Sequence, residues 1–219
     1  MTPVLQVFAK APVAGECKTR LIPALGAEGA ARLHERLVRH RLAMAHEWQQ
    51  AAQQSAPDAC IELWCAPDTQ HAFFAACARE FNVTLRQQTG PDLGARMWLA
   101  LCGALARGAR PVLIGSDCPW LMADDIAAAF AALDQADAVV APAHDGGYVL
   151  TGLARAVPEL FTNIAWGTAK VMSSTRKAAA RTHTHLAELR TLHDLDTPAD
   201  LTRLKAVPQF AALLDGLNP

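Results

Sequence analysis

Short apolar runs alternate with longer stretches of helical periodicity along most of this chain. Residues 4–9 form an apolar run that predicts a buried first strand, and residues 28–48 follow with apolar side chains at helical spacing. Residues 111–115, PVLIG, are wholly apolar and predict a central parallel strand. The same patterns predict further strands at 60–65, 83–86, 138–141, 148–153 and 186–189, and helices at 69–81, 95–107, 124–133, 168–181 and, with breaks, from 198.

Strands that alternate with helices over the first two-thirds of the chain predict a parallel, doubly wound α/β sheet. The chain has 219 residues, and no linker, repeat or low-complexity tract divides it. A single domain over residues 1–219 is therefore expected. Apolar residues make up 52% and charged residues 19% of the chain, a composition that is typical of globular proteins.

Charge and composition argue against several classes of partner. The net charge is −1 and no basic tract stands out, so we expect no nucleic-acid partner. No run approaches the roughly 18 apolar residues that span a bilayer, and the N-terminus lacks the features of a signal peptide, so we expect no membrane partner. The six cysteines are scattered, mostly in apolar segments, which favours reduced thiols and a cytoplasmic location.

The loop after the first strand carries Lys10, Lys18 and Arg20 within eleven residues. The carboxyl end of the first strand is where open α/β sheets hold phosphorylated ligands, and Gly15 lets the backbone approach closely. Lysine supplies a point charge, while arginine can grip two phosphate oxygens at once. A lone cation would more simply be a solvated surface charge, but three beside a glycine favour phosphate binding. The loop is not a Walker loop, because Cys17 stands where that motif has glycine.

Asp117 lies directly beyond the predicted central strand, in the segment GSDCP. Mg²⁺ prefers oxygen ligands and usually takes one or two carboxylates together with substrate phosphates. The alternative is that Asp117 caps the next helix. Pro119 and the distance to Asp124, which is better placed as a cap, weaken that alternative. A metal role for Asp117 is the favoured interpretation.

Asp194 and Asp196 are separated by one residue and can lie on one side of an extended segment, within reach of a metal. The competing interpretation is helix capping, with Asp196 or Thr197 at the cap and Pro198 at the first helical position. Both roles are compatible, with Asp194 the freer ligand.

The segment HDGGY, residues 144–148, predicts first a tight turn between two strands. Gly146 and Gly147 would also let a ligand lie against the backbone, and His144 or Asp145 could contact an acceptor. The turn alone is the simpler interpretation of the two glycines.

A second turn-rich segment, residues 90–97, precedes a predicted helix. Gly94 could approach a flat nucleobase, and Arg96 could stack on it or hydrogen-bond to it. A plain helix N-terminus with Asp92 favourable to the dipole is comparably supported. Trp166 could cover a ligand, although tryptophan more often belongs to a core.

Taken together, these segments resemble a bacterial family of transferases with the glycosyltransferase-A fold and no known function. That family is related to the phospholactate guanylyltransferases and the molybdenum-cofactor nucleotidyltransferases. The matching segments follow one another over nearly the whole chain: residues 8–12 with Gly15 and 18–20, then 92–97, 115–119, 145–148, Ile164 with Trp166, and 194–198.

The resemblance implies a three-layer α/β/α sandwich with a mostly parallel sheet, as in nucleotide-diphospho-sugar transferases, with the nucleotide across the strand ends. It also implies that Gly15, Lys18 and Arg20 hold phosphates, that Asp117 binds Mg²⁺ or Mn²⁺, and that Gly94 and Arg96 contact the base. The chain departs from the molybdenum-cofactor enzymes at residues 10–14, KAPVA, where those relatives have a glycine-rich run. We therefore expect this chain to bind a triphosphate through different contacts from those of the molybdenum-cofactor enzymes.

Three functions fit these patterns. The first is nucleotidyl transfer from a nucleoside triphosphate to a small phosphorylated acceptor, in which Lys18 and Arg20 neutralise developing charge and Asp117 holds the metal. The second is glycosyl transfer from a nucleoside-diphosphate sugar, in which Asp145 or His144 is the nearest candidate base. The third is a nucleotide-binding module without turnover. The charged loop slightly favours the first, because departing pyrophosphate must be held there.

Overall fold

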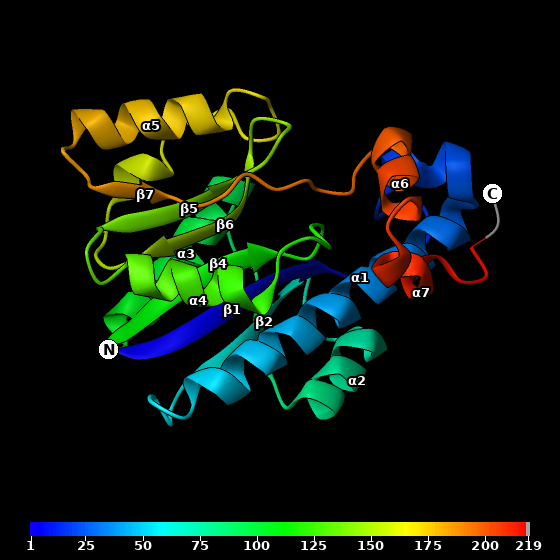
Figure 1. Ribbon diagram of the computed structural model, residues 1–219, viewed down its shortest axis with the longest axis horizontal. Helices are drawn as coiled ribbons and strands as arrows, with labels where there is room; N and C mark the ends of the chain where they lie inside the picture. The colour runs from blue at the N-terminus through cyan, green and yellow to red at the C-terminus, as the bar shows by residue number, and fades with distance from the viewer. Residues whose placement is uncertain (218–219) are drawn as a thin grey trace.

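A seven-stranded sheet runs through the middle of the molecule, which the computed structural model describes over residues 1–217 (Figure 1). Its strands are β1 (Thr2–Lys10), β2 (Cys60–Ala66), β3 (Thr84–Gln87), β4 (Ala109–Gly115), β5 (Ala138–Pro142), β6 (Tyr148–Leu153) and β7 (Leu186–Glu188). Their spatial order is β3-β2-β1-β4-β6-β5-β7. Strand β6 is antiparallel to β4 and β5, and the other pairs are parallel. The expected mostly parallel sheet is confirmed.

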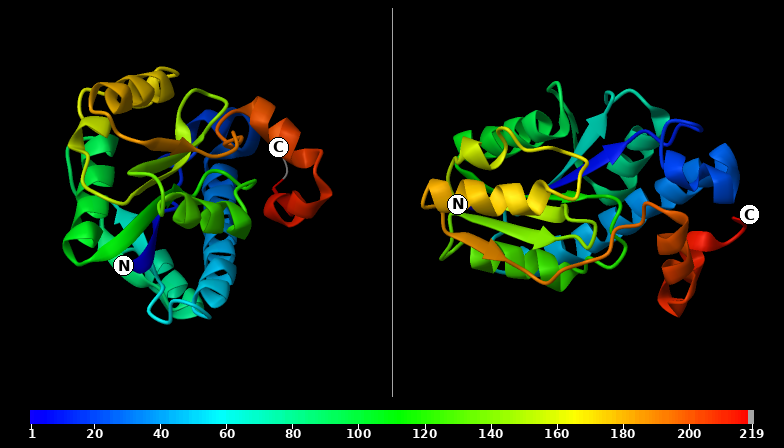
Figure 2. Two further views of the ribbon diagram at one scale, coloured as in Figure 1. Left: turned by 60° about the vertical axis from the view of Figure 1, so that its left-hand side comes forward. Right: turned by 90° about the horizontal axis from the view of Figure 1, so that it is seen from above.

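Helices cover both faces of the sheet, so the expected three-layer arrangement is also confirmed (Figure 2). The helices are α1 (Ile22–Ala52), α2 (Ala72–Phe81), α3 (Leu93–Ala106), α4 (Ala123–Ala132), α5 (Val171–Arg181), α6 (Pro198–Lys205) and α7 (Ala211–Leu214), with 3-10 turns η1 (Thr19–Leu21), η2 (Pro158–Leu160) and η3 (Pro208–Phe210). Helices α1, α2 and α4 pack on one face, and α3 and α5 on the other. No helix within residues 1–217 combines the length and apolarity needed to cross a membrane.

The alternation of side chains along β1 separates the two cores. Leu5 and Val7 point into the core beneath α1 and α2, while Phe8 packs on the α3 side. Gln6, also on the α3 side, is fully buried and donates from its amide nitrogen to the carbonyl of Ala100 in α3 at 2.9 Å. Buried on both faces, β1 is therefore an interior strand whose carboxyl end opens into the site described below.

Two helix starts differ from the expectation for local reasons. Helix α1 begins at Ile22, earlier than predicted, and is bent at Gly26, whose φ of 69° interrupts the helical run. Helix α4 has Met122 at its N-cap position, and the Asp125 carboxylate accepts from the Met122 amide at 2.8 Å. The expectation that Asp124 caps this helix is therefore wrong, because the residue one position later reaches back to the cap.

An extended segment, residues 189–197, crosses from β7 to α6, and we call it the strap (Figure 1). It pairs with the end of β5 through the Leu192 amide, which donates to the Pro142 carbonyl at 2.9 Å. Further on, the Leu195 amide donates to the Asp117 carbonyl at 2.8 Å. Beyond the strap, α6 and α7 pack against the start of α1 in a separate apolar cluster. The strap thereby carries C-terminal residues past the end of β4.

Candidate functional site

An open cavity of about 690 Å³ lies at the carboxyl ends of the parallel strands. Its floor includes Phe8 of β1 and Leu113 of β4, and its rim includes Lys10, Asp117 and Asp194. Such an edge is where open α/β sheets bind ligands, because loops from several strands meet there. The cavity is large enough for a nucleotide and a second small molecule.

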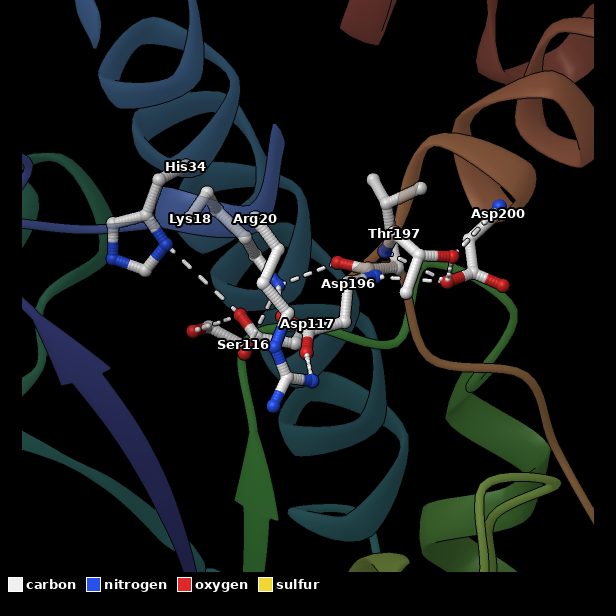
Figure 3. A network of polar contacts seen from close by, with 9 residues as sticks. Lys18, Arg20, His34, Ser116, Asp117, Asp196, Thr197 and Asp200 are labelled. Atoms are coloured by element: carbon white, nitrogen blue, oxygen red, sulfur yellow. Dashed lines mark hydrogen bonds and ion pairs between the residues drawn. The ribbon is translucent and has the colours of Figure 1, made fainter. Parts of the chain in front are cut away.

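Lys18 and Asp117 meet at the wall of this cavity (Figure 3). The Lys18 Nζ lies 3.1 Å from Asp117 Oδ2 and donates to the Leu195 carbonyl at 2.5 Å. The Lys18 side chain is only 3% exposed, whereas the Asp117 side chain is 49% exposed. The backbone of Lys18 has a φ of 48°, which turns the chain inward just before η1. Lys18 and Asp117 therefore lie together, as the sequence led us to expect. The lysine is buried, and the carboxylate is the group exposed to the cavity.

Arg20 lies near Lys18 and Asp117 and forms an ion pair with Asp196 of the strap. Its Nη1 donates to Asp196 Oδ2 at 2.6 Å, and its side chain is 67% exposed and lines the cavity. Asp196 Oδ1 lies 3.7 Å from the Lys18 Nζ. Asp196 is thus already engaged by two cations, which leaves it less available to a metal than Asp194.

Asp117 is ionised at neutral pH for a specific electrostatic reason. Burial opposes its charge, but the adjacent Lys18 ammonium outweighs that effect and holds its pKa below the ordinary value. Ser116 also donates to Asp117 Oδ1 at 3.2 Å. A half-exposed, ionised carboxylate at a cavity wall is suited to a divalent cation.

His34 of α1, which the sequence did not single out, lies beneath Asp117. Its Nε2 contacts the Lys10 carbonyl at 2.9 Å, and its buried Nδ1 has no hydrogen-bond partner and lies 3.9 Å from Asp117 Oδ1. Burial lowers the pKa of His34, against the opposing effect of Asp117. The imidazole is therefore neutral, with its proton on Nε2. Only its place on the buried stripe of α1 could have drawn attention to it.

The strap and the β5–β6 turn bring two further carboxylates to the cavity, those of Asp194 and Asp145. Burial and, next, the charge of Asp145 raise the pKa of Asp194. The Asp145 Oδ1 accepts from the Gly147 amide at 2.8 Å, which fixes the turn. Asp194 forms no ion pair among residues 1–217. It is the freer of the two strap carboxylates, as the sequence suggested.

The donor set fits a divalent ion that arrives with a phosphorylated ligand. Asp117 and Asp194 offer carboxylate oxygens at the cavity, but the described part of the chain holds no ready-made group of three or more His, Cys, Asp or Glu for a metal. Mg²⁺ commonly keeps several waters and binds through one or two carboxylates plus phosphate oxygens. Capping accounts for the neighbouring residues, since the Thr197 hydroxyl caps α6 with Pro198 at its start.

The structure separates the ligand-binding residues expected around α3. Arg96 lines the cavity, and its Nε donates to the Gly90 carbonyl at 3.1 Å. Gly94 is buried and does not line the cavity, because a Cβ there would lie 2.0 Å from Trp166 Nε1. Gly94 therefore accommodates the Trp166 indole, which itself lines the cavity. The close approach that the sequence assigned to a nucleobase is made by a side chain of the protein.

The remaining glycines divide in the same way. Gly147 lines the cavity, whereas Gly146 has a φ of 92° and packs so closely on Ala169 that a Cβ would lie 2.3 Å from the Ala169 carbonyl oxygen. Gly15 has a φ of 82°, is exposed and lies outside the cavity lining. Gly15 and Gly146 thus shape loops, and Gly147 alone of the three borders the ligand space.

Gln88, just beyond β3, also lines the cavity and was not expected to. Its Nε2 donates to the carbonyls of Trp64 at 2.8 Å and Ala9 at 3.2 Å. Both amide protons are therefore used, and the carbonyl oxygen of Gln88 is left as a hydrogen-bond acceptor. Its position two residues beyond a short predicted strand was the only signal in the sequence.

Comparison with known proteins agrees with this geometry. The family model described as "Uncharacterized protein conserved in bacteria (DUF2064)" matches residues 33–168. A structure from Desulfovibrio desulfuricans G20, described as a candidate nucleotide-diphospho-sugar transferase, is 27% identical, with a TM-score of 0.82 and coverage of 100% of both chains. No protein of curated function matches the sequence.

Two more distant structures share the fold alone. The 4-diphosphocytidyl-2C-methyl-D-erythritol synthase of Anaerococcus prevotii DSM 20548 is 9% identical, with a TM-score of 0.60 over 95% of this chain and 99% of that one. The glucosyl-3-phosphoglycerate synthase of Mycobacterium tuberculosis, in complex with Mn²⁺, UDP and glucosyl-3-phosphoglycerate, is 10% identical, with a TM-score of 0.52 over 97% and 78%. The comparisons support the prediction of a transferase.

Proposed function

This chain belongs to DUF2064, a family of uncharacterized proteins conserved in bacteria, and from its site we propose a divalent-metal-dependent transferase that uses a nucleotide-linked donor. The observation that carries the proposal is the contact of Lys18 with Asp117 at the wall of an open cavity, with Arg20 and Lys10 beside them. A nucleoside diphosphate that binds in this cavity with Mg²⁺ or Mn²⁺ would meet both a carboxylate for the ion and cations for the phosphate oxygens.

The balance of charge favours a diphosphate donor, and hence a nucleoside-diphosphate sugar. Lys18 is neutralised by Asp117 and Arg20 by Asp196. Of the lysine and arginine side chains that line the cavity, Lys10 and Arg96 remain without a carboxylate partner within residues 1–217. A triphosphate would bring more negative charge than these cations can offset. The structure from D. desulfuricans described above supports the same choice of donor.

In this reaction an acceptor hydroxyl oxygen forms a bond to the anomeric carbon of the donor sugar. The bond between that carbon and the diphosphate oxygen breaks, and the nucleoside diphosphate leaves with the electron pair. The hydroxyl proton passes to a base, for which the Asp145 carboxylate at the cavity is the nearest candidate. Lys10 would stabilise the leaving diphosphate, and a bound divalent ion would supply further charge neutralisation.

Nucleotidyl transfer to a phosphorylated acceptor is the second candidate. Lys10 and Arg20 both flank the carboxyl end of β1, where a departing pyrophosphate would lie. An acceptor phosphate oxygen would attack the α-phosphorus of a nucleoside triphosphate, and pyrophosphate would leave. This reaction needs no strong base. Its product, pyrophosphate, distinguishes it from glycosyl transfer, which yields a nucleoside diphosphate.

A donor screen tests these proposals directly. Nucleoside-diphosphate sugars and nucleoside triphosphates are each added with and without Mg²⁺ or Mn²⁺, and the rise in melting temperature is measured. We expect metal-dependent stabilisation by at least one nucleoside-diphosphate sugar and metal-dependent release of nucleoside diphosphate from it. Release of pyrophosphate from a triphosphate would favour the second candidate. Absence of any metal-dependent nucleotide binding would contradict both.

Asp117→Asn tests the metal role while leaving an oxygen near the Lys18 ammonium. We expect it to reduce metal-dependent turnover by about 10²-fold or more, because a charged ligand to the ion is lost. The matched control is Asp124→Asn, an exposed aspartate in the first turn of α4, which should keep full activity. Equal turnover in the two variants would exclude a metal at Asp117. Nucleotide binding that survives with no turnover in the wild-type protein would instead indicate a binding module.

We also propose that the expected single domain, residues 1–219, forms the catalytic unit and that it works in the cytoplasm. All six cysteines are free thiols, which agrees with a reducing compartment.

A further inference from the structure

The cavity extends well beyond Lys10, Arg20 and Asp117, where we place the phosphates, to a second region that we call the β6 side. It is formed by residues 143–151 and 166–171, together with Asp194 of the strap. Charge is sorted between the two regions. The lysine and arginine residues of the lining, Lys10, Arg20 and Arg96, belong to the N-terminal part of the chain, and no lysine, arginine or histidine within residues 143–171 lines the cavity.

Two hydroxyl groups on the β6 side have no partner in the described part of the chain. Thr151 is 2% exposed, lies opposite Leu113 across the β4–β6 pair and lines the cavity, yet its hydroxyl makes no hydrogen bond. The hydroxyl of Tyr148, which lies three residues earlier in β6 and also lines the cavity, makes none either. Hydroxyl groups that line a cavity and have no protein partner are available to hydrogen-bond a polar ligand.

An aromatic surface and two carboxylates complete this region. Trp166 meets Tyr148 edge to face at 6.0 Å between ring centroids, and both rings line the cavity. Asp145 and Asp194 border the same space. Aromatic rings pack on the apolar C–H face of a ligand, while carboxylates accept from its hydroxyl groups.

A phosphorylated group would find little to bind on the β6 side. Lys170 is exposed and does not line the cavity. The start of α5 is also occupied, because the Val171 amide donates to the Thr168 carbonyl at 3.3 Å and the Met172 amide to the Gly146 carbonyl at 2.9 Å. These two amides, which could otherwise hold an anion at the helix N-terminus, are thus already used.

We propose that the β6 side binds an uncharged, polyhydroxylated group and selects against a phosphorylated one. This inference rests on the proposed function, since the nucleotide occupies the other half of the cavity. The group is either the sugar of the donor or a sugar-like acceptor. These share one chemistry: hydroxyls for Thr151 and Asp145 and a C–H face for Trp166.

Calorimetry in the presence of Mn²⁺ tests whether the β6 side binds the sugar of the donor. The probes are UDP against UDP-glucose and GDP against GDP-mannose. For the base that binds, we expect the diphosphate sugar to bind about tenfold more tightly than the diphosphate, the effect of one or two net hydrogen bonds. Thr151→Val and Asp145→Asn should each remove most of this gain and leave affinity for the diphosphate unchanged. Lys170→Gln should change neither affinity. Thr151→Val keeps the shape of the side chain and loses no internal hydrogen bond, so it should fold normally.

Free glucose and glucose 6-phosphate test whether the β6 side binds a sugar-like acceptor. Each is titrated with and without the bound diphosphate. Binding of glucose, weakened by Thr151→Val, places a sugar-like acceptor on the β6 side. The inference is overturned if neither the donor sugar nor free glucose adds affinity. It is also overturned if glucose 6-phosphate binds more tightly than glucose and Lys170→Gln weakens it. Failure of every nucleoside diphosphate to bind would instead count against the proposed function, while the glucose titration alone would still decide the inference.

Discussion

Lys18 holds its ammonium among three oxygen atoms from two distant parts of the chain: Asp117 Oδ2 after β4, and the Leu195 carbonyl and Asp196 Oδ1 of the strap. A buried ammonium needs such partners, because burial without them costs several kilocalories per mole. Lys18 therefore acts first as the fixed counter-ion that keeps Asp117 ionised and in position. Arg20 and Lys10, which are exposed, are the cations that can move toward a phosphate.

Lys18→Met tests this role for the lysine. The change leaves the Leu195 carbonyl and Asp117 without their shared partner, so we expect the free energy of unfolding to fall by about 1–3 kcal/mol. Urea unfolding measures it. The matched control is Lys10→Met, because Lys10 is exposed and its ammonium donates only to the Glu16 carbonyl, so its loss should cost less than about 0.5 kcal/mol. Similar losses in the two variants would show that Lys18 is not a structural counter-ion.

His34 predicts a pH dependence of stability. Burial lowers its pKa below the ordinary value of 6.5, so the unfolded chain binds this proton more readily than the folded protein does. Its contribution to stability is complete above pH 6.5 and is lost as the pH falls through the folded pKa. His34→Gln keeps a donor for the Lys10 carbonyl and removes the titration. Between about pH 7.5 and about pH 5.5 the variant should lose less stability than the wild type. Parallel losses would contradict a neutral, buried His34.

Helix α3 places its glycines where two different constraints act. At Gly94 a Cβ would lie 2.0 Å from Trp166 Nε1, whereas at Gly103 the nearest atom is the Arg107 Nη1 at 3.7 Å. The first glycine makes room for a cavity wall, and the second only weakens the helix. The same residue type in one helix thus serves packing in one place and has no packing role in the other.

Gly94→Ala and Gly103→Ala form a matched pair. We expect Gly94→Ala to displace Trp166, to destabilise the protein by about 1–3 kcal/mol and to weaken ligand binding on the β6 side. Gly103→Ala should stabilise by about 0.5–1 kcal/mol, because alanine favours the helix and nothing obstructs its methyl group. Chemical unfolding and the UDP-glucose titration measure both effects. Stabilisation by both substitutions would show that Trp166 yields easily and does not define the wall.

At the scale of the whole molecule, local pattern was enough to predict the sheet. Each expected strand lies within two residues of the observed one at either end, because apolar runs bounded by turns are local signals. Helix starts were predicted less well, since they depend on caps such as His71 before α2, whose Nδ1 accepts from the Phe73 amide. The single domain stays a prediction.

The candidate site could be predicted only in part. Lys18, Arg20 and Asp117 each follow a predicted strand, so their convergence at one sheet edge follows from topology. Gly94 and Gly146 border protein atoms, and not the cavity, because the Trp166 and Ala169 segment folds back over them. His34 and Thr151 were missed because they lie inside a helix and a strand, where nothing in the sequence distinguishes a cavity wall from a core.

The strap has a consequence for how the protein comes into being. Lys18 and Leu195, which share a hydrogen bond, are 177 positions apart. On a ribosome the early part of the chain leaves the exit tunnel long before the strap has been translated. Until then, the ammonium has neither the Leu195 oxygen nor Asp196 to meet it. The nascent polypeptide therefore completes the surroundings of the Lys18 ammonium only after the strap has emerged from the ribosome.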